Sequence, residues 1–111
     1  MGIAMADAKK APQRKLNKEV EGYIRRIGQL RSQGKFGRAV QMCDRALEAA
    51  DEPLIRNVIL QFKGDSLYRV GRRVKDDKVV SQARSCYMAV LKSNPNDAIA
   101  KNGVDRIDRY F

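Results

Sequence analysis

The chain has 111 residues, 43% of them apolar, which suits one folded domain and is too short for two full cores. It carries 23 Lys and Arg against 13 Asp and Glu and no His, a formal net charge of +10. This excess attracts polyanions such as RNA, DNA, anionic lipid and acidic protein surfaces, but it does not define a fold. No stretch approaches membrane-spanning length and the opening MGIAMADAKK does not have the order of a secretory signal, so we expect a cytoplasmic protein.

The first 15 residues mix Ala, Lys, Gln and one Pro without apolar periodicity, which predicts a basic, flexible tail over 1–15. The folded domain is expected to span 16–111. Because the tail accounts for only three of the ten net charges, the folded part keeps seven. A membrane surface is the least favoured partner, since the tail offers cations to anionic lipid but no apolar anchor.

Two helices are predicted within a first hairpin over 16–50. Apolar residues recur at steps of three and four from Leu16 to Leu30, and again from Phe36 to Leu47. Gly34 ends the first stripe, and the second opens only two residues later, so the helices must fold back on each other. A cap oxygen at Asp51 and a proline at position 53 then suit the start of a third helix.

A second hairpin is predicted over 54–93, followed by a helix over 97–110. The third helix runs from Leu54 to about Val74 and contains Gly71, which marks either a break or a close helix contact. Asp76 and Asp77 suit the N-terminus of the fourth helix. The turn sequence SNPND at 93–97 ends that helix. The chain is therefore expected to be all-α, with five helices and no strand.

No constellation for catalysis or metal binding is found in the sequence. There is no His, no nucleophile elbow and no phosphate-binding glycine loop, so we expect a protein that is not an enzyme and uses no cofactor. Cys43 and Cys86 stand alone in apolar stretches, and we expect both to be reduced core residues. The acidic pairs at 76–77 and 105–108 are assigned capping or solvated roles.

The second and fourth predicted helices repeat each other at an offset of 44 residues. The aligned pairs are Ala39 with Ala83, Cys43 with Tyr87, Ala46 with Val90, and Leu47 with Leu91. The stretches GKFGRAVQMCDRAL and ARSCYMAVLKSNPND that contain them resemble the second half of a tetratricopeptide repeat. This resemblance covers about residues 20–110. It departs from the family in its offset, which exceeds 34, in the missing Leu-Gly pair of the first helix, and at Lys78 and Val80, where a Gly and an aromatic are usual.

The resemblance implies antiparallel hairpins stacked as a short right-handed solenoid, with the last helix as a cap; a generic helical solenoid or bundle is the alternative. As a cap, that helix should place Ile99, Ile107 and Phe111 in the core. Alternatively, Tyr110 and Phe111 dock on another chain. A homo-oligomer formed through helical faces is a separate alternative.

The resemblance also implies an adaptor or scaffold for protein–protein interaction. Its ligand would be a protein or peptide segment, and an acidic segment is one option. Its groove contacts here would be Arg69 and Lys101, although the carboxylate clamp of one subset of the family does not carry over. Cations also gather at the turns inside the two hairpins, which would form one basic edge. The predicted basic edge comprises Arg31, Lys35, Arg38, Arg72, Arg73, Lys75 and Lys78.

An RNA-associated or ribosome-associated protein is the alternative function, with the basic edge and the tail lying on phosphates. Compensation of helix dipoles explains where the cations stand but not their surplus. Aromatic residues are scarce and lie mostly on apolar stripes, so any contact with nucleic acid would be to phosphates and sensitive to salt.

Overall fold

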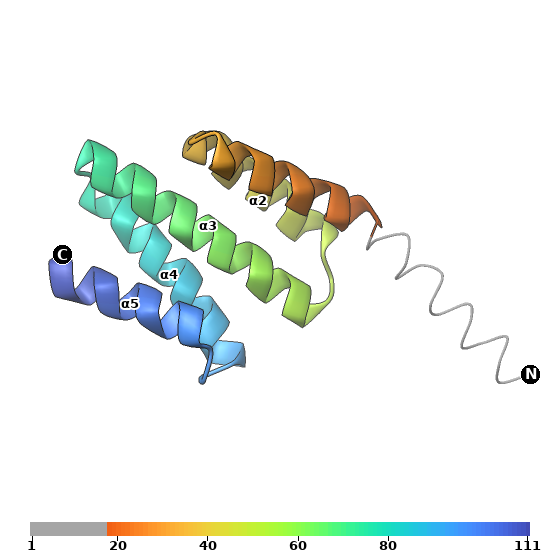
Figure 1. The fold of residues 1–111 in the computed structure, drawn as a ribbon. Helices are drawn as coiled ribbons and strands as arrows, with labels where there is room; N and C mark the ends of the chain where they lie inside the picture. The colour runs from red at the N-terminus through yellow and green to blue at the C-terminus, as the bar shows by residue number, and fades with distance from the viewer. Residues whose placement is uncertain (1–17) are drawn as a thin grey trace, which may run out of the picture.

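The computed structural model describes residues 18–111 and is all-helical over that range, with no strand. The tail predicted over 1–15 lies outside the described residues. A first helix, described over 18–32, is followed by α2 (Phe36–Ala49), α3 (Pro53–Val74), α4 (Asp77–Ser93) and α5 (Ala98–Tyr110) (Figure 1). The predicted all-α fold class is confirmed.

The turns follow the expected chemistry at all but one place. Gly34 has a φ of 75°, which a residue without a Cβ adopts at little cost, and its N–H donates to the Arg31 carbonyl at 3.0 Å. Pro53 is the first residue of α3, as predicted. The predicted Asp51 cap is wrong, because Glu52 holds the cap position and makes no side-chain capping bond. At the same turn the Arg56 guanidinium donates to the carbonyls of Leu47 and Ala50, at 2.6 and 2.8 Å, and so satisfies acceptors at the end of α2.

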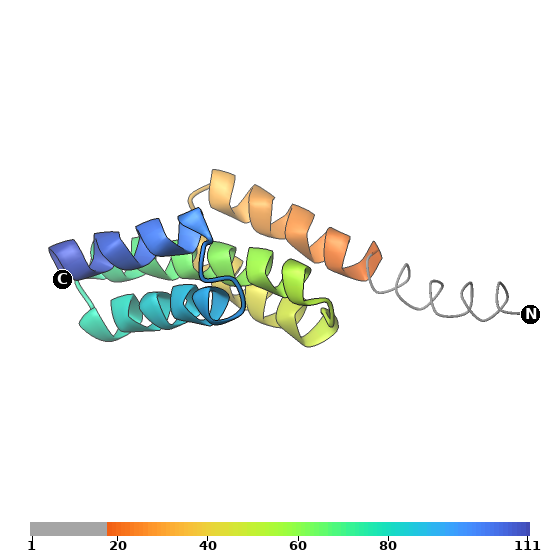
Figure 2. The same ribbon diagram turned by 90° about the horizontal axis from the view of Figure 1, so that it is seen from below.

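Helix α3 lies at the centre of the described structure. The first helix and α5 lie on one side of it and α2 and α4 on the other (Figure 2). Its 22 residues explain why the repeat offset of 44 exceeds the usual 34. The additional residues lengthen helix α3 and not a loop, since only two residues separate α3 from α4. Lys75 has a φ of 55° in this short turn, and Asp76 caps α4 by accepting from the N–H groups of Lys78 and Val79.

Two core clusters share α3. One lies between the first helix, α2 and α3, and the other between α3, α4 and α5. The first cluster consists of Val20, Ile27, Cys43, Ala46, Ala50 and Ile59. The second consists of Leu67, Tyr68, Val80, Ala83, Cys86, Tyr87, Val90, Ala100 and Ile107. Each hairpin therefore covers apolar surface that the other leaves open.

The burial pattern supports the offset of 44 within this chain. The first three aligned pairs, Ala39 with Ala83, Cys43 with Tyr87 and Ala46 with Val90, are buried, and Leu47 and Leu91 are both half-buried. Membership of the tetratricopeptide family and stacking as a solenoid stay predictions. Cys43 and Cys86 are buried free thiols, as expected, and burial raises the pKa of Cys43 to about 12.

The Tyr87 ring fills a gap that two glycines open between α3 and α5. A Cβ added at Gly103 would lie 2.5 Å from Tyr87 Cε2, and one at Gly64 would lie 3.0 Å from Cε1. Real Cβ atoms essentially never approach to 2.5 Å, so α5 owes its position beside α4 to the missing Cβ at 103, while a Cβ at 64 would be tight. Gly71 similarly marks a close contact rather than a break, because its Cβ would lie 2.7 Å from Val80 Cγ2.

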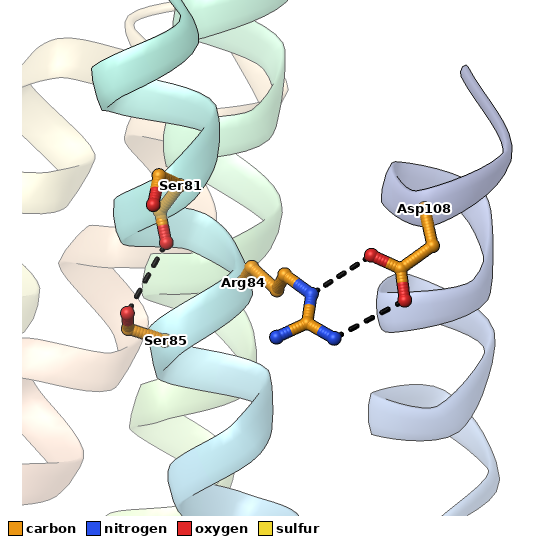
Figure 3. Close-up of polar contacts among 4 residues, drawn as sticks. All are labelled: Ser81, Arg84, Ser85 and Asp108. Carbon is orange, nitrogen blue, oxygen red and sulfur yellow. Dashed lines mark hydrogen bonds and ion pairs between the residues drawn. The ribbon is translucent and has the colours of Figure 1, made fainter. Parts of the chain in front are cut away.

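Polar contacts also hold α5. Arg84 of α4 donates to both carboxylate oxygens of Asp108, at 2.8 and 3.2 Å, and this pairing lowers the pKa of Asp108 (Figure 3). In the same view the Ser85 hydroxyl donates to the Ser81 carbonyl at 3.2 Å, a contact internal to α4. The Gln61 amide donates to Asp97 at 2.8 Å and ties the start of α5 to α3.

The expected core role of the last helix is confirmed for one residue of three. Ile107 is buried, with 4% of its surface exposed. Ile99 was expected in the core and is 61% exposed, because the buried face of α5 passes through Ala100, Gly103 and Ile107 instead. Phe111 is 53% exposed and makes only an edge contact with Tyr68, the ring centroids lying 6.0 Å apart.

Replacing Gly103 by Ala should destabilise the fold although alanine favours helices. The helix gains about 1 kcal/mol from the exchange, but relief of the overlap with Tyr87 should cost about 1 to 3 kcal/mol. Gly28→Ala is the matched control, because nothing lies within 4 Å of its added Cβ, and it should stabilise. Urea unfolding of the two variants measures both effects. Equal shifts in the two variants would contradict the close contact at Gly103.

Replacing Ala39 by Leu should lower the free energy of unfolding by about 1 to 3 kcal/mol, because Ala39 is completely buried and a larger side chain overpacks the site. Thermal unfolding measures the change. An unchanged midpoint would show that the registration of the repeat is wrong.

Alkaline solution should unfold the chain partly through Tyr87. Burial raises the pKa of Tyr87 to about 12, from 10.0 in an exposed tyrosine. Because the fold disfavours the ionised form, this contribution to stability is complete below about pH 10 and is lost as the pH rises toward 12. Tyr87→Phe should therefore lose less stability than the parent over this window in denaturant titrations at fixed pH. Cys43 titrates in both proteins, so a difference reports Tyr87.

Candidate functional site

Two hollows adjoin at the C-terminal end of α3, and both are rich in cations. The turn hollow, with a volume of about 550 Å³, is lined by Gly34, Lys35, Phe36, Gly37, Arg38, Arg69, Val70, Arg73 and Val74. The arginine hollow, of about 380 Å³, is lined by Tyr68, Arg69, Arg72, Arg73 and Arg106. They share Arg69 and Arg73, so a single ligand can contact both.

The length of α3 brings these residues together. Its last turns extend to the loop between the first helix and α2, and the Arg69 guanidinium lies 5.1 Å from the centre of the Phe36 ring. Arg69 also pairs with Asp65 at 3.4 Å, one turn earlier on the same helix. This cation–π contact and ion pair hold Arg69 across the boundary between the two hollows.

Asp65, the partner of Arg69, also accepts from a second arginine. Arg31 of the first helix pairs with Asp65 and lies 4.9 Å above the Phe62 ring. Arg31 is half-buried by these contacts. The predicted basic-edge residue Arg31 therefore joins the first helix to α3 and lines neither hollow.

The arginine hollow includes a cation that the sequence did not indicate. Arg106 of α5 lies 5.3 Å from the centre of the Tyr68 ring. The acids beside it on α5 are paired elsewhere, Asp105 with Arg109 at 3.0 Å and Asp108 with Arg84 at 2.8 Å. Finding Arg106 requires knowing how α5 docks, and no spacing along the chain links position 106 to the end of α3.

The other predicted site residues divide between the hollows and the surrounding surface. Lys35 and Arg38 line the turn hollow, and Arg72 the arginine hollow, while Arg73 lines both. Lys75 and Lys78 are exposed at the turn between α3 and α4 and line neither. The predicted groove pair is not brought together, because Lys101 is exposed on α5 and lines neither hollow that contains Arg69.

The acidic turns lie at the other end of α3. The loops that precede α3 and follow α4 both lie near its N-terminus (Figure 1), whereas the hollows are lined by residues from its C-terminal turns. The Asn57 amide donates to the Ser93 hydroxyl at 2.9 Å there, which places the end of α4 beside the start of α3.

Residues 18–111 contain no group of His, Cys, Asp and Glu side chains arranged to hold a metal ion. Over the same residues, no helix combines the length and apolar character needed to cross a membrane. Comparison with known proteins gives no match, either to a protein-family model, to a curated protein or to a solved structure.

Proposed function

We propose that this chain is a non-enzymatic, tetratricopeptide-like adaptor that binds an acidic protein segment carrying an apolar side chain. One observation carries the proposal. The turn hollow combines an apolar surface, made by Phe36, Val70 and Val74, with cations at its margin, among them Lys35 and Arg38. Such a surface suits a peptide that presents carboxylates beside an aliphatic or aromatic group.

The two parts of the lining would contribute differently to binding. Burial of an apolar side chain against Phe36 and Val74 supplies affinity, at about 25 cal/mol per Å² before the costs of association. Val74 is 60% exposed in this chain, so it has apolar surface left to cover. The cations attract the acidic segment and set its direction, which affects the rate of association and the choice of partner more than affinity.

A second candidate is an RNA-associated or ribosome-associated protein that binds phosphates through the same edge. It is supported by Arg72, Lys75 and Lys78, which are exposed around the turn between α3 and α4 and make no ion pair within residues 18–111. The apolar part of the turn hollow favours the peptide, because a phosphate backbone has no group to bury there.

Replacing Val74 by Ser should separate the two candidates, because it removes apolar surface without changing charge. We expect it to weaken binding of a short fluorescein-labelled peptide of Asp, Glu and Leu by roughly fivefold and to leave binding of a generic RNA oligomer unchanged. Fluorescence anisotropy at ~50 and ~200 mM salt measures both. Val58→Ser is the control on the same helix, since Val58 is 39% exposed and lines neither hollow.

The charge-reversed double variant Arg72→Glu, Arg73→Glu should weaken binding of both the acidic peptide and the RNA oligomer at low salt. Peptide binding that Val74→Ser leaves unchanged would contradict the proposal. Tight RNA binding lost in the double variant, with no peptide binding by the parent, would favour the second candidate.

A further inference from the structure

The arginine hollow has a lining unlike that of its neighbour. Apart from Tyr68, every residue that lines it is an arginine, three from the last turns of α3 and one from α5. Tyr68 is 4% exposed and forms a fixed wall, and Arg106 is held over its ring. No acidic side chain lines this hollow.

The positive charge of the hollow is largely uncompensated within residues 18–111. Arg72, Arg73 and Arg106 make no ion pair there, and Arg69 shares the single carboxylate of Asp65 with Arg31. The negative end of α3 is equivalent to roughly half an elementary charge, which offsets less than one of the four guanidinium groups. Helix capping therefore does not explain why four arginines meet here.

A phosphate monoester fits this lining better than a carboxylate. It carries about −1.5 to −2 charge near neutral pH and three strong acceptor oxygens, whereas a carboxylate has one charge and two oxygens. Arginine remains charged and donates paired, parallel N–H groups that match phosphate oxygens. A single carboxylate pairs with one or two guanidinium groups, as Asp65 does with Arg31 and Arg69, and would leave the others of this hollow without an acceptor.

We infer that the arginine hollow binds a phosphorylated side chain, so that the adaptor recognises a phosphopeptide. The inference rests on the proposed function and names the chemistry of the partner. Because Arg69 and Arg73 line both hollows, the phosphorylated residue would lie close in sequence to the apolar residue held by the turn hollow. An RNA phosphodiester, with one charge per group, is a separate outcome of the test.

The test uses two fluorescein-labelled peptides of Asp, Glu and Leu that differ only in a phosphoserine or a Glu at one position. The full chain should bind the phosphoserine peptide roughly tenfold more tightly, as expected for additional charge-assisted hydrogen bonds. Arg106→Gln and Arg72→Gln should each remove most of this preference. Arg25→Gln is the matched control, because Arg25 is exposed on the first helix, lines neither hollow and carries the same charge.

The pH dependence offers a second readout. The chain has no His, so lowering the pH from about 7.5 to about 5.5 mainly protonates the phosphate, whose second pKa is about 6. The preference for the phosphoserine peptide should shrink over this range, while affinity for the Glu peptide stays nearly constant. Circular dichroism of each variant confirms that it remains folded.

The outcomes distinguish this inference from the proposed function. Equal affinity for the two peptides, with binding still weakened by Val74→Ser, overturns the inference and leaves the adaptor standing. Equal losses in the variants at positions 106 and 25 also overturn it, since net charge alone would then be responsible. Binding of an RNA oligomer with no binding of either peptide overturns both proposals.

Discussion

The close approach of α5 to the rest of the fold depends on one aromatic ring and two missing side chains. Tyr87 projects from α4 into the space between Gly64 and Gly103, where a Cβ at position 103 would overlap its ring. This contact sets the distance of α5 from α3, and that distance places Arg106 over Tyr68. The arginine hollow, half of the candidate site, is thus a consequence of how the core packs.

Asp65 has a comparable role at the other hollow. It receives Arg31 from the first helix and Arg69 from its own helix, and each arginine also covers a phenylalanine ring. The contacts are partly exposed, so their main effect is to fix orientations rather than to add much stability. They hold the first hairpin against α3. The cations that follow Arg69 on α3, Arg72 and Arg73, remain available to a ligand.

The sequence pattern predicted the helices and turns well because these depend on local chemistry. Apolar spacing located all five helices, and Gly34, Pro53 and Asp76 act at their ends as expected. Apart from the Asp51 cap, which failed locally because Glu52 holds that position, the misplaced residues depend on tertiary packing. Ile99 lies on the apolar stripe of α5 yet faces outward, and Arg106 joins the site only because α5 crosses near Tyr68. Lys101 and Arg69 were predicted to line one groove, but Lys101 lines neither of the hollows that contain Arg69.

The sharing of α3 by both core clusters also bears on how the protein can open. Removing the first helix and α2 would expose one side of α3, and removing α4 and α5 would expose the other, so neither cluster is an independent folding unit. Unfolding is then a cooperative event of the whole described chain, without a stable half that could persist alone. The described residues would unfold as one cooperative unit. A ligand that bridges the two hollows at the end of α3 would therefore raise the free energy of unfolding of this whole unit.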